Sequence, residues 1–177
     1  MIEFHSNKTP NSQKIIIALN EMNIPYNPIY YDVFKGEHLT PEFGRINPNY
    51  KLPAIVDLDP ADGGAPVTVF ETAAILLYLA DKVGQFLPKD ARSRSAVTQW
   101  LVWQVAGMGP MFGQANHFIR YAPEGQDYAI NRFCKEAQRL LSVMESRLRV
   151  AEFLGGEYSI ADMACWPWVK TADTMSI

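Results

Sequence analysis

Two pairs of neighbouring residues carry the groups that a short peptide ligand would need. Leu52 and Pro53 stand at the start of a short apolar strand, and Glu71 and Thr72 stand where a later strand ends and a helix begins. Proline has no backbone N–H and tolerates a cis bond, so Pro53 can turn the Leu52 backbone outward to pair with an extended ligand. Free N–H groups at a helix N-terminus attract a carboxylate, while the Glu71 side chain can bind an ammonium. The γ-glutamyl end of glutathione carries both charges, so the pattern predicts a glutathione site.

A polar cluster nearer the N-terminus, Thr9-Pro10-Asn11-Ser12, could activate the thiol of that ligand. Only a thiolate attacks disulfides or electrophiles, and lowering a thiol pKa by two units requires about 2.7 kcal/mol in favour of the anion. A helix N-terminus supplies about 0.3–1 kcal/mol, and each hydrogen bond to a charged group supplies about 1.5–3 kcal/mol. The Thr9 hydroxyl and the Asn11 amide are suitable donors. Such a cluster more often serves as a plain helix cap, but the nearby peptide signature favours the catalytic interpretation.

Other residues could complete the site. Lys51 precedes the ligand-pairing strand and can reach a carboxylate, although a lysine in this position most often only faces solvent. A set of aromatic residues in the second half of the chain could receive a hydrophobic second substrate, but their helical spacing places most of them in a core. This set is Trp100, Trp103, Phe112, His117, Phe118 and Tyr121.

The elements that must position the site follow from the hydrophobic pattern of the first half. Short alternating runs predict strands, and apolar residues at helical spacing predict helices. The order is β-α-β-α-β-β-α, which is the thioredoxin-like order, with a parallel first pair of strands and an antiparallel second pair. The predicted elements are a strand at 2–5, a helix that starts at the cluster 9–12 and continues to 22, a strand at 29–33, a short helix from Thr40 to Phe43, strands at 54–58 and 67–70, and a helix at 72–82.

After about residue 87 only helical periodicity remains, so we expect a thioredoxin-like domain over 1–87 and an all-α domain over 88–177. Gly109 and Pro110 should end or kink the first long helix of the second domain. Ser159 and Asp162 have the spacing of a capping box that opens an apolar helix. The fold class is therefore α/β followed by a helical bundle.

Composition and residue spacing argue against several classes of function. The chain has 177 residues, a net charge of −3 and no block of like charge, which argues against a nucleic-acid partner. No apolar run is long enough to span a membrane and no leader pattern opens the chain, so we expect a cytoplasmic protein. Cys134 and Cys165 are far apart, which excludes a CxxC pair, and the histidines lack metal-ligand spacing. A reacting thiol would have to come from the ligand.

Several long segments resemble the glutathione transferase superfamily, and most closely its Nu-class bacterial enzymes, which use glutathione in disulfide-bond reductase chemistry. The resemblance extends from Met1 to about Val169 and implies the same two-domain architecture and a homodimer. Family members usually continue for further helices, so we expect the helical domain here to be incomplete. The matching segments are TPNSQKIIIAL, KGEHLTPEFGRINPNYKLPAIVD, VFETAAILLYLADK, QWLVWQVAGMGPMFGQANHF and EYSIADMACWPW.

The resemblance also implies roles for individual residues. Thr9 and Asn11 match the threonine and asparagine that the Nu class uses at the thiol. His38 stands where close relatives commonly carry a glutamine that contacts the glycyl end, although a lone loop histidine is equally often idle. Arg132 matches an arginine that reaches the ligand, in some members from the neighbouring subunit. The cluster lacks the cysteine or tyrosine of other classes, which argues against a covalent enzyme intermediate.

The sequence therefore predicts a glutathione-dependent thiol–disulfide oxidoreductase that uses glutathione as co-substrate to reduce small disulfides. One alternative is conjugation of glutathione to hydrophobic electrophiles in an aromatic cleft. A second is a glutathione-binding regulator without catalysis, since the superfamily includes such members. In all three interpretations the binding residues are His38, Lys51, Leu52, Pro53, Glu71, Thr72 and Arg132, with Thr9 and Asn11 at the thiol and no metal.

Overall fold

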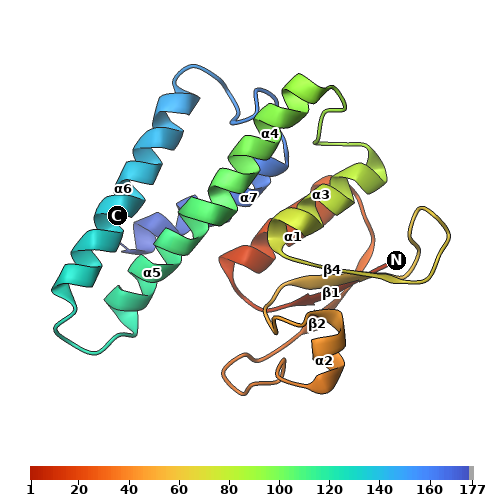
Figure 1. Ribbon diagram of the computed structural model, residues 1–177, viewed down its shortest axis with the longest axis horizontal. Coiled ribbons are helices and arrows are strands. Elements are labelled where there is room, and N and C mark those ends of the chain that lie inside the picture. The colour runs from red at the N-terminus through yellow and green to blue at the C-terminus, as the bar shows by residue number, and fades with distance from the viewer. Residues whose placement is uncertain (176–177) are drawn as a thin grey trace. The chain divides into compact units, whose positions relative to one another are not determined.

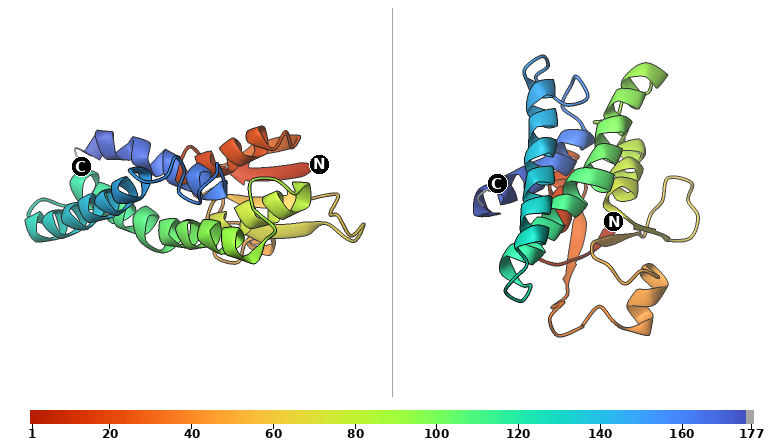
Figure 2. Two further views of the ribbon diagram at one scale, coloured as in Figure 1. Left: turned by 90° about the horizontal axis from the view of Figure 1, so that it is seen from above. Right: turned by 60° about the vertical axis from the view of Figure 1, so that its left-hand side comes forward.

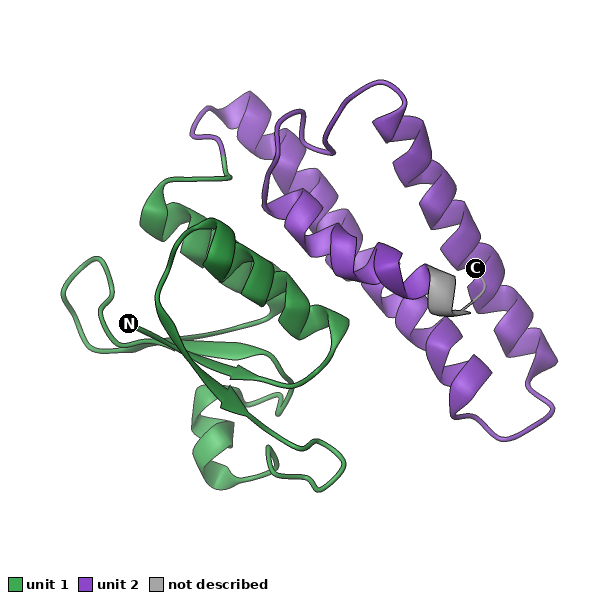
Figure 3. Ribbon diagram, turned by 180° about the vertical axis from the view of Figure 1, so that it is seen from behind, with its two compact units in different colours: residues 1–87 green, residues 88–177 purple. Residues whose placement is uncertain are grey.

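The computed structural model describes residues 1–175 and divides into two compact units, residues 1–87 and 88–177 (Figure 3). The first unit combines a sheet with helices in the predicted β-α-β-α-β-β-α order, and the second is helical. The first unit contains β1 (Ile2–Ser6), α1 (Pro10–Glu21), β2 (Tyr26–Tyr30), α2 (Pro41–Ile46), β3 (Ala54–Asp57), β4 (Val67–Phe70) and α3 (Thr72–Val83). The second contains α4 (Ala91–Trp103), the π-helical turn η1 (Gln104–Met108), α5 (Gly109–Arg120), α6 (Asp127–Leu148) and α7 (Ile160–Met175).

The sheet has the strand order β2-β1-β3-β4. β1 pairs with β2 in parallel, whereas β3 is antiparallel to both β1 and β4, which confirms the predicted parallel and antiparallel pairs. Helices α1 and α3 lie side by side on one face of the sheet, and α2 covers the other face (Figure 1). Apolar residues from these elements form a dry core that fixes the ends of α1 and α3 next to the start of β3. Its members include Phe4, Ile15, Leu19, Ile55, Ile75 and Leu79.

The second strand lies earlier in the chain than the sequence predicts. We expected it over 29–33, after Pro28, whereas the structure places it at Tyr26–Tyr30 with Pro28 opposite Phe4. Because β2 is at the edge of the sheet, it has a single neighbouring strand, and a residue without a backbone N–H is tolerated there. The strand therefore begins three residues before the run that predicted it, and it includes Pro28.

The irregularity that the sequence predicts around Gly109-Pro110 is present in the second unit. The regular helix α4 ends at Trp103, the wider turn η1 follows, and α5 begins at Gly109 (Figure 2). Pro110 lies in the first turn of α5, where a missing N–H is tolerated best. Such π-helical turns are the usual way in which a helix accommodates a residue that the regular hydrogen-bond ladder cannot.

The predicted capping box at the start of α7 is confirmed. The Asp162 carboxylate accepts hydrogen bonds from the Ser159 backbone N–H and hydroxyl, each at 3.0 Å, and from the Leu154 N–H at 3.0 Å. The Ser159 hydroxyl oxygen in turn accepts the Ala161 N–H at 3.3 Å. The bond from Ala161 satisfies an N–H group that the first helical turn leaves unpaired, and the bond from the Ser159 N–H to Asp162 is the reciprocal bond of the capping box. Across residues 1–175, the helices are all too short or too polar to cross a lipid bilayer.

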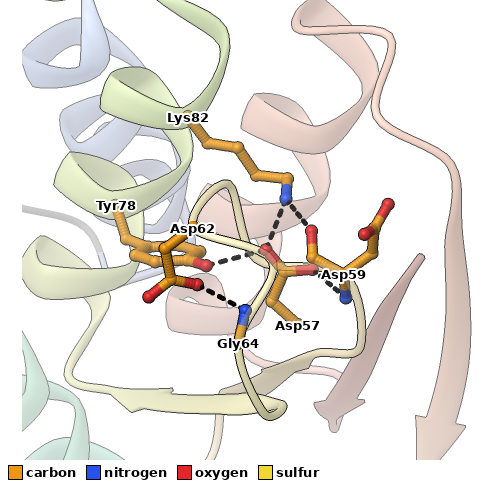
Figure 4. A network of polar contacts seen from close by, with 6 residues as sticks. All are labelled: Asp57, Asp59, Asp62, Gly64, Tyr78 and Lys82. Carbon is orange, nitrogen blue, oxygen red and sulfur yellow. Dashed lines mark hydrogen bonds and ion pairs between the residues drawn. The ribbon is translucent and has the colours of Figure 1, made fainter.

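A buried carboxylate ties the end of β3 to α3 (Figure 4). Asp57 is fully buried, and its Oδ2 accepts hydrogen bonds from Lys82 Nζ at 2.6 Å and from the Tyr78 hydroxyl at 2.7 Å. Its Oδ1 accepts the Asp59 backbone N–H at 3.0 Å. Burial would raise the pKa of Asp57, but the bonds from Lys82 and Tyr78 outweigh it and lower that pKa. Burial and the bond to Asp57 raise the pKa of Tyr78 to about 12.

Replacing Asp57 by asparagine should reduce the free energy of unfolding by about 2–3 kcal/mol, because a neutral amide cannot accept three charge-assisted hydrogen bonds. Because the folded pKa of Asp57 lies below the unfolded value of 3.8, its contribution is present above that pH and is lost as pH falls further. Urea unfolding at pH 7 and at pH 3 measures both effects. The matched control is Asp59→Asn, since Asp59 enters the network through its backbone. Equal losses in the two variants would contradict this assignment.

Candidate ligand-binding site

One small cavity gathers most of the residues that the sequence singled out. Its volume is about 210 Å³, and it lies in the first unit, between the start of α1, the loop before β3 and the start of α3. Residues 60 positions apart in the sequence therefore meet at one place. The lining residues are Asn11, Asn47, Lys51, Leu52, Pro53, Glu71 and Thr72.

The backbone beside this cavity offers a free edge. The Leu52–Pro53 peptide bond is cis, and Leu52 lies outside the strands of the sheet. Within the described part of the chain, the Leu52 N–H and C=O form no hydrogen bond. Backbone groups of this kind need partners, and an extended peptide laid along the edge would supply both of them.

Asn47, which the sequence interpretation assigned only to a turn, holds this edge in place. Its side chain is buried, donates from Nδ2 to the Lys51 carbonyl at 2.7 Å and accepts the Asn49 N–H at 2.9 Å. Its own N–H, directly after the end of α2, donates to the carbonyl of Phe43 within that helix at 2.8 Å. One residue thus joins α2 to the residue that precedes Leu52. The only signal in the sequence was the Asn-Pro-Asn run, which predicts a turn without predicting its long-range contact.

Two opposite charges face the cavity without an intramolecular partner. Glu71 is exposed, has a positive φ of 70° and makes no side-chain hydrogen bond to cap α3. Neither the Glu71 carboxylate nor the Lys51 ammonium forms an ion pair with any residue that the structure describes. Both charges are therefore available to a ligand that carries an ammonium and a carboxylate.

A third charge lies beneath the cavity and was missed by the sequence interpretation. Lys14 on α1 is only 1% exposed, and its Nζ lies 3.3 Å from the Thr72 hydroxyl oxygen. Thr72 itself is buried at the first position of α3. A signal did exist, because Lys14 stands four residues before Ala18 and so interrupts the apolar face of α1 with a charge.

The Thr9 cluster separates into two roles. The Thr9 side chain caps α1 by accepting the Ser12 N–H at 3.4 Å, and its hydroxyl donates to Asn7 Oδ1 at 2.9 Å. Thr9 is not among the lining residues, whereas Asn11 lines the cavity at the N-terminal end of the helix. Thr9 thus forms the plain helix cap, and Asn11 is the member of the cluster that lines the cavity.

His38 and Arg132 are not brought to this cavity. His38 lies in a turn between β2 and α2, and its Nδ1 is buried without a hydrogen-bond partner among the described residues. Arg132, on α6, lines a larger cavity of about 860 Å³ within the helical unit, together with Met111 and Tyr128. Size alone would favour that cavity, but the smaller one combines the free backbone edge with the unpaired charges, so we take it as the candidate site.

The site contains no protein thiol. The two cysteines, Cys134 and Cys165, form no disulfide with each other and belong to the helical unit. Burial raises the pKa of Cys134, which disfavours its thiolate. Among the described residues, no three His, Cys, Asp or Glu side chains are grouped as metal ligands would be.

A thioredoxin-like unit followed by a helical unit is the architecture of a glutathione transferase, and comparison with known proteins agrees. Residues 9–82 match the family described as the glutathione S-transferase N-terminal domain. The chain is 54% identical over 171 residues to the disulfide-bond oxidoreductase YfcG of Escherichia coli, covering 96% of this chain and 80% of that protein. The protein therefore belongs to the glutathione transferase family.

Solved structures of glutathione transferases have the same fold as this chain. A glutathione transferase from Burkholderia graminis, with two glutathione molecules bound per subunit, superimposes with a TM-score of 0.91 at 42% identity and covers 98% of this chain and 76% of its own. A glutathione transferase from Pseudomonas putida, with one glutathione disulfide bound per subunit, has a TM-score of 0.93 at 37% identity, over 99% of this chain and 77% of its own.

Replacing Asn47 by alanine should lower the free energy of unfolding by about 2 kcal/mol, because the Lys51 carbonyl and the Asn49 N–H both lose a buried partner. Urea denaturation measures the change. Asn49→Ala is the control, since Asn49 is exposed and contributes its backbone N–H. A loss below about 0.5 kcal/mol in the Asn47 variant would show that the loop keeps its shape without this side chain.

Proposed function

We propose that the protein reduces small disulfides with the thiol of bound glutathione, as a glutathione-dependent thiol–disulfide oxidoreductase. The observation that carries the proposal is a cavity built for a charged peptide in a unit that contains no cysteine. A thioredoxin-like enzyme without its own thiol must obtain the reacting sulfur from the ligand. The similarity to an oxidoreductase at 54% identity supports the same reaction class.

The cavity residues suggest how glutathione binds. Leu52 pairs with the backbone of the cysteinyl residue through its free N–H and C=O, next to Pro53. Glu71 takes the γ-glutamyl ammonium, and Thr72 with the α3 N-terminus takes the neighbouring carboxylate. Lys51 takes the glycyl carboxylate at the other end of the ligand. His38 remains a proposed second contact of the glycyl end.

Asn11 is the proposed donor to the thiolate. A shift of two pKa units requires about 2.7 kcal/mol, which one hydrogen bond to the sulfur and the helix N-terminus can supply together. Thr9 is the second residue of this proposal. Because its hydroxyl donates to Asn7 Oδ1, it must turn away from Asn7 to reach a sulfur directly.

The reaction balances with two molecules of glutathione. The first thiolate attacks one sulfur of the substrate disulfide, which forms a mixed disulfide and releases a substrate thiolate that takes up a proton. A second glutathione thiolate attacks the glutathione sulfur of the mixed disulfide, which releases the other substrate thiol and glutathione disulfide. The substrate gains two electrons, and two glutathione molecules lose one each. The relatives with two glutathione molecules or one glutathione disulfide bound carry the matching reactant and product.

Replacing Asn11 by alanine should reduce turnover of 2-hydroxyethyl disulfide about 10- to 100-fold, because one hydrogen bond to a charged sulfur is lost. The dissociation constant for glutathione should change less than about threefold, since the backbone and charge contacts remain. Steady-state kinetics and calorimetry on the same preparations measure the two quantities. Asn20→Ala, at an exposed position of the same helix, is the matched control. Equal losses of turnover and affinity would contradict a thiolate-stabilising role.

The same preparation separates this proposal from its rivals. Fast conjugation of a chlorodinitrobenzene-type electrophile without disulfide turnover would favour the transferase alternative. Glutathione binding with neither activity would favour the regulator. The aromatic residues give the transferase alternative little support, because Phe112 is fully buried and Phe118 stacks on Phe133 of α6 at 5.4 Å.

A homodimer belongs to the same proposal, with Arg132 reaching glutathione across the subunit interface. Arg132→Ala should then raise the glutathione KM several-fold with little change in kcat, because a binding contact is lost. The control is Lys135→Ala, which removes a cation from the same cavity wall. Native mass spectrometry reports the oligomeric state, and a monomer with full activity would overturn the cross-subunit role.

We assign this reaction to the cytoplasm, where glutathione is kept mostly reduced and can act as the electron donor. The lack of a disulfide between Cys134 and Cys165 fits that compartment. Fractionation of cells that express the protein tests the assignment, and recovery with a compartment outside the cytoplasm would contradict it.

A further inference from the structure

Lys14 carries a buried charge, and the proposed binding scheme gives it no role. Lysine is rarely buried to this extent without a specific partner, and burial of an ammonium is costly unless hydrogen bonds compensate for it. Here the side chain is 1% exposed, and its Nζ reaches the Thr72 hydroxyl oxygen at 3.3 Å, across from α1 to α3. Thr72 lines the cavity. The ammonium therefore lies directly behind a group that faces the ligand.

The chemistry of the two groups determines which one donates. An ammonium has three N–H donors and no acceptor, so the Thr72 oxygen must accept in this contact. The hydroxyl hydrogen is then left to another partner, and Thr72 donates to no atom among the described residues. Since Thr72 lines the cavity, a ligand acceptor is the partner that remains. The contact with Lys14 thus turns the Thr72 hydroxyl into a donor.

We propose that Lys14 is a positioning residue that makes Thr72 selective for the carboxylate at the γ-glutamyl end of the ligand. This inference rests on glutathione being the ligand, as in the proposed function. It also explains how adjacent residues recognise opposite charges. Glu71 presents a carboxylate to the ligand ammonium, while Thr72, with the Lys14 cation behind it, presents a polarised O–H to the ligand carboxylate.

The test compares two ligands that differ in this carboxylate alone. Calorimetry is run with glutathione and with an analogue whose γ-glutamyl group is replaced by 4-aminobutanoyl, which keeps the ammonium and lacks the carboxylate. Lys14→Met keeps the length of the side chain and removes its charge. It should raise the dissociation constant for glutathione about tenfold or more and change that for the analogue less than about twofold. Lys8→Met, at an exposed position, makes the same change in net charge and should affect neither ligand.

Two Thr72 variants keep the proposal testable if the Lys14 variant folds poorly. Thr72→Val should lose affinity for glutathione selectively, as Lys14→Met does, whereas Thr72→Ser should retain it. In the double variant the two losses should not add, because both act through one hydroxyl.

Equal weakening of the two ligands in the Lys14 and Thr72→Val variants would overturn the inference, because a merely structural role affects both. An unchanged affinity for glutathione would overturn it as well. Binding of glutathione without disulfide reduction would remove the proposed function and leave this comparison intact. Failure of the wild-type protein to bind glutathione at all would remove both.

Discussion

The hydrogen bond from the Asn47 amide to the Lys51 carbonyl is the contact on which the site depends most. It spans four residues of irregular backbone and sets where Leu52 stands relative to α2. Irregular backbone has no repeating ladder to hold it, so a buried side chain must supply the missing partners. Because Asn47 holds Lys51 in place, the Leu52 backbone can keep its N–H and C=O groups unpaired.

The cavity shows a division of charge along a very short stretch of chain. Glu71 and Thr72 are consecutive, yet one is left exposed with a bare carboxylate and the other is buried against an ammonium. The turn into α3 produces this difference, because the positive φ at Glu71 directs the two side chains into different surroundings. One turn of backbone and one distant lysine thus give two adjacent residues opposite electrostatic surroundings.

The sequence predicted the parts of this protein that depend on local patterns. The β-α-β-α-β-β-α order, the capping box at Ser159 and the antiparallel pair all follow from periodicity or from residues a few positions apart. The prediction of strand bounds failed where tertiary position overrides local preference, as in the edge strand β2, which includes Pro28. The sequence did not predict the contacts of Asn47 and Lys14 for a related reason, because their partners come near only in the folded chain. Asn11 and Leu52, which the sequence singled out from two separate short motifs, both line the small cavity.

The thioredoxin-like unit contains no cysteine, so it has no thiol that peroxide could oxidise. A catalytic protein thiol can be oxidised beyond the sulfenic state to sulfinic and sulfonic acids, which largely inactivates it for good. When the reacting sulfur arrives with a diffusible peptide, an over-oxidised molecule simply leaves and a fresh one takes its place. The two cysteines that the chain does carry lie in the other unit, where burial keeps Cys134 in its less reactive protonated form. A site of this kind should keep working through peroxide stress that would disable an enzyme with its own active thiol.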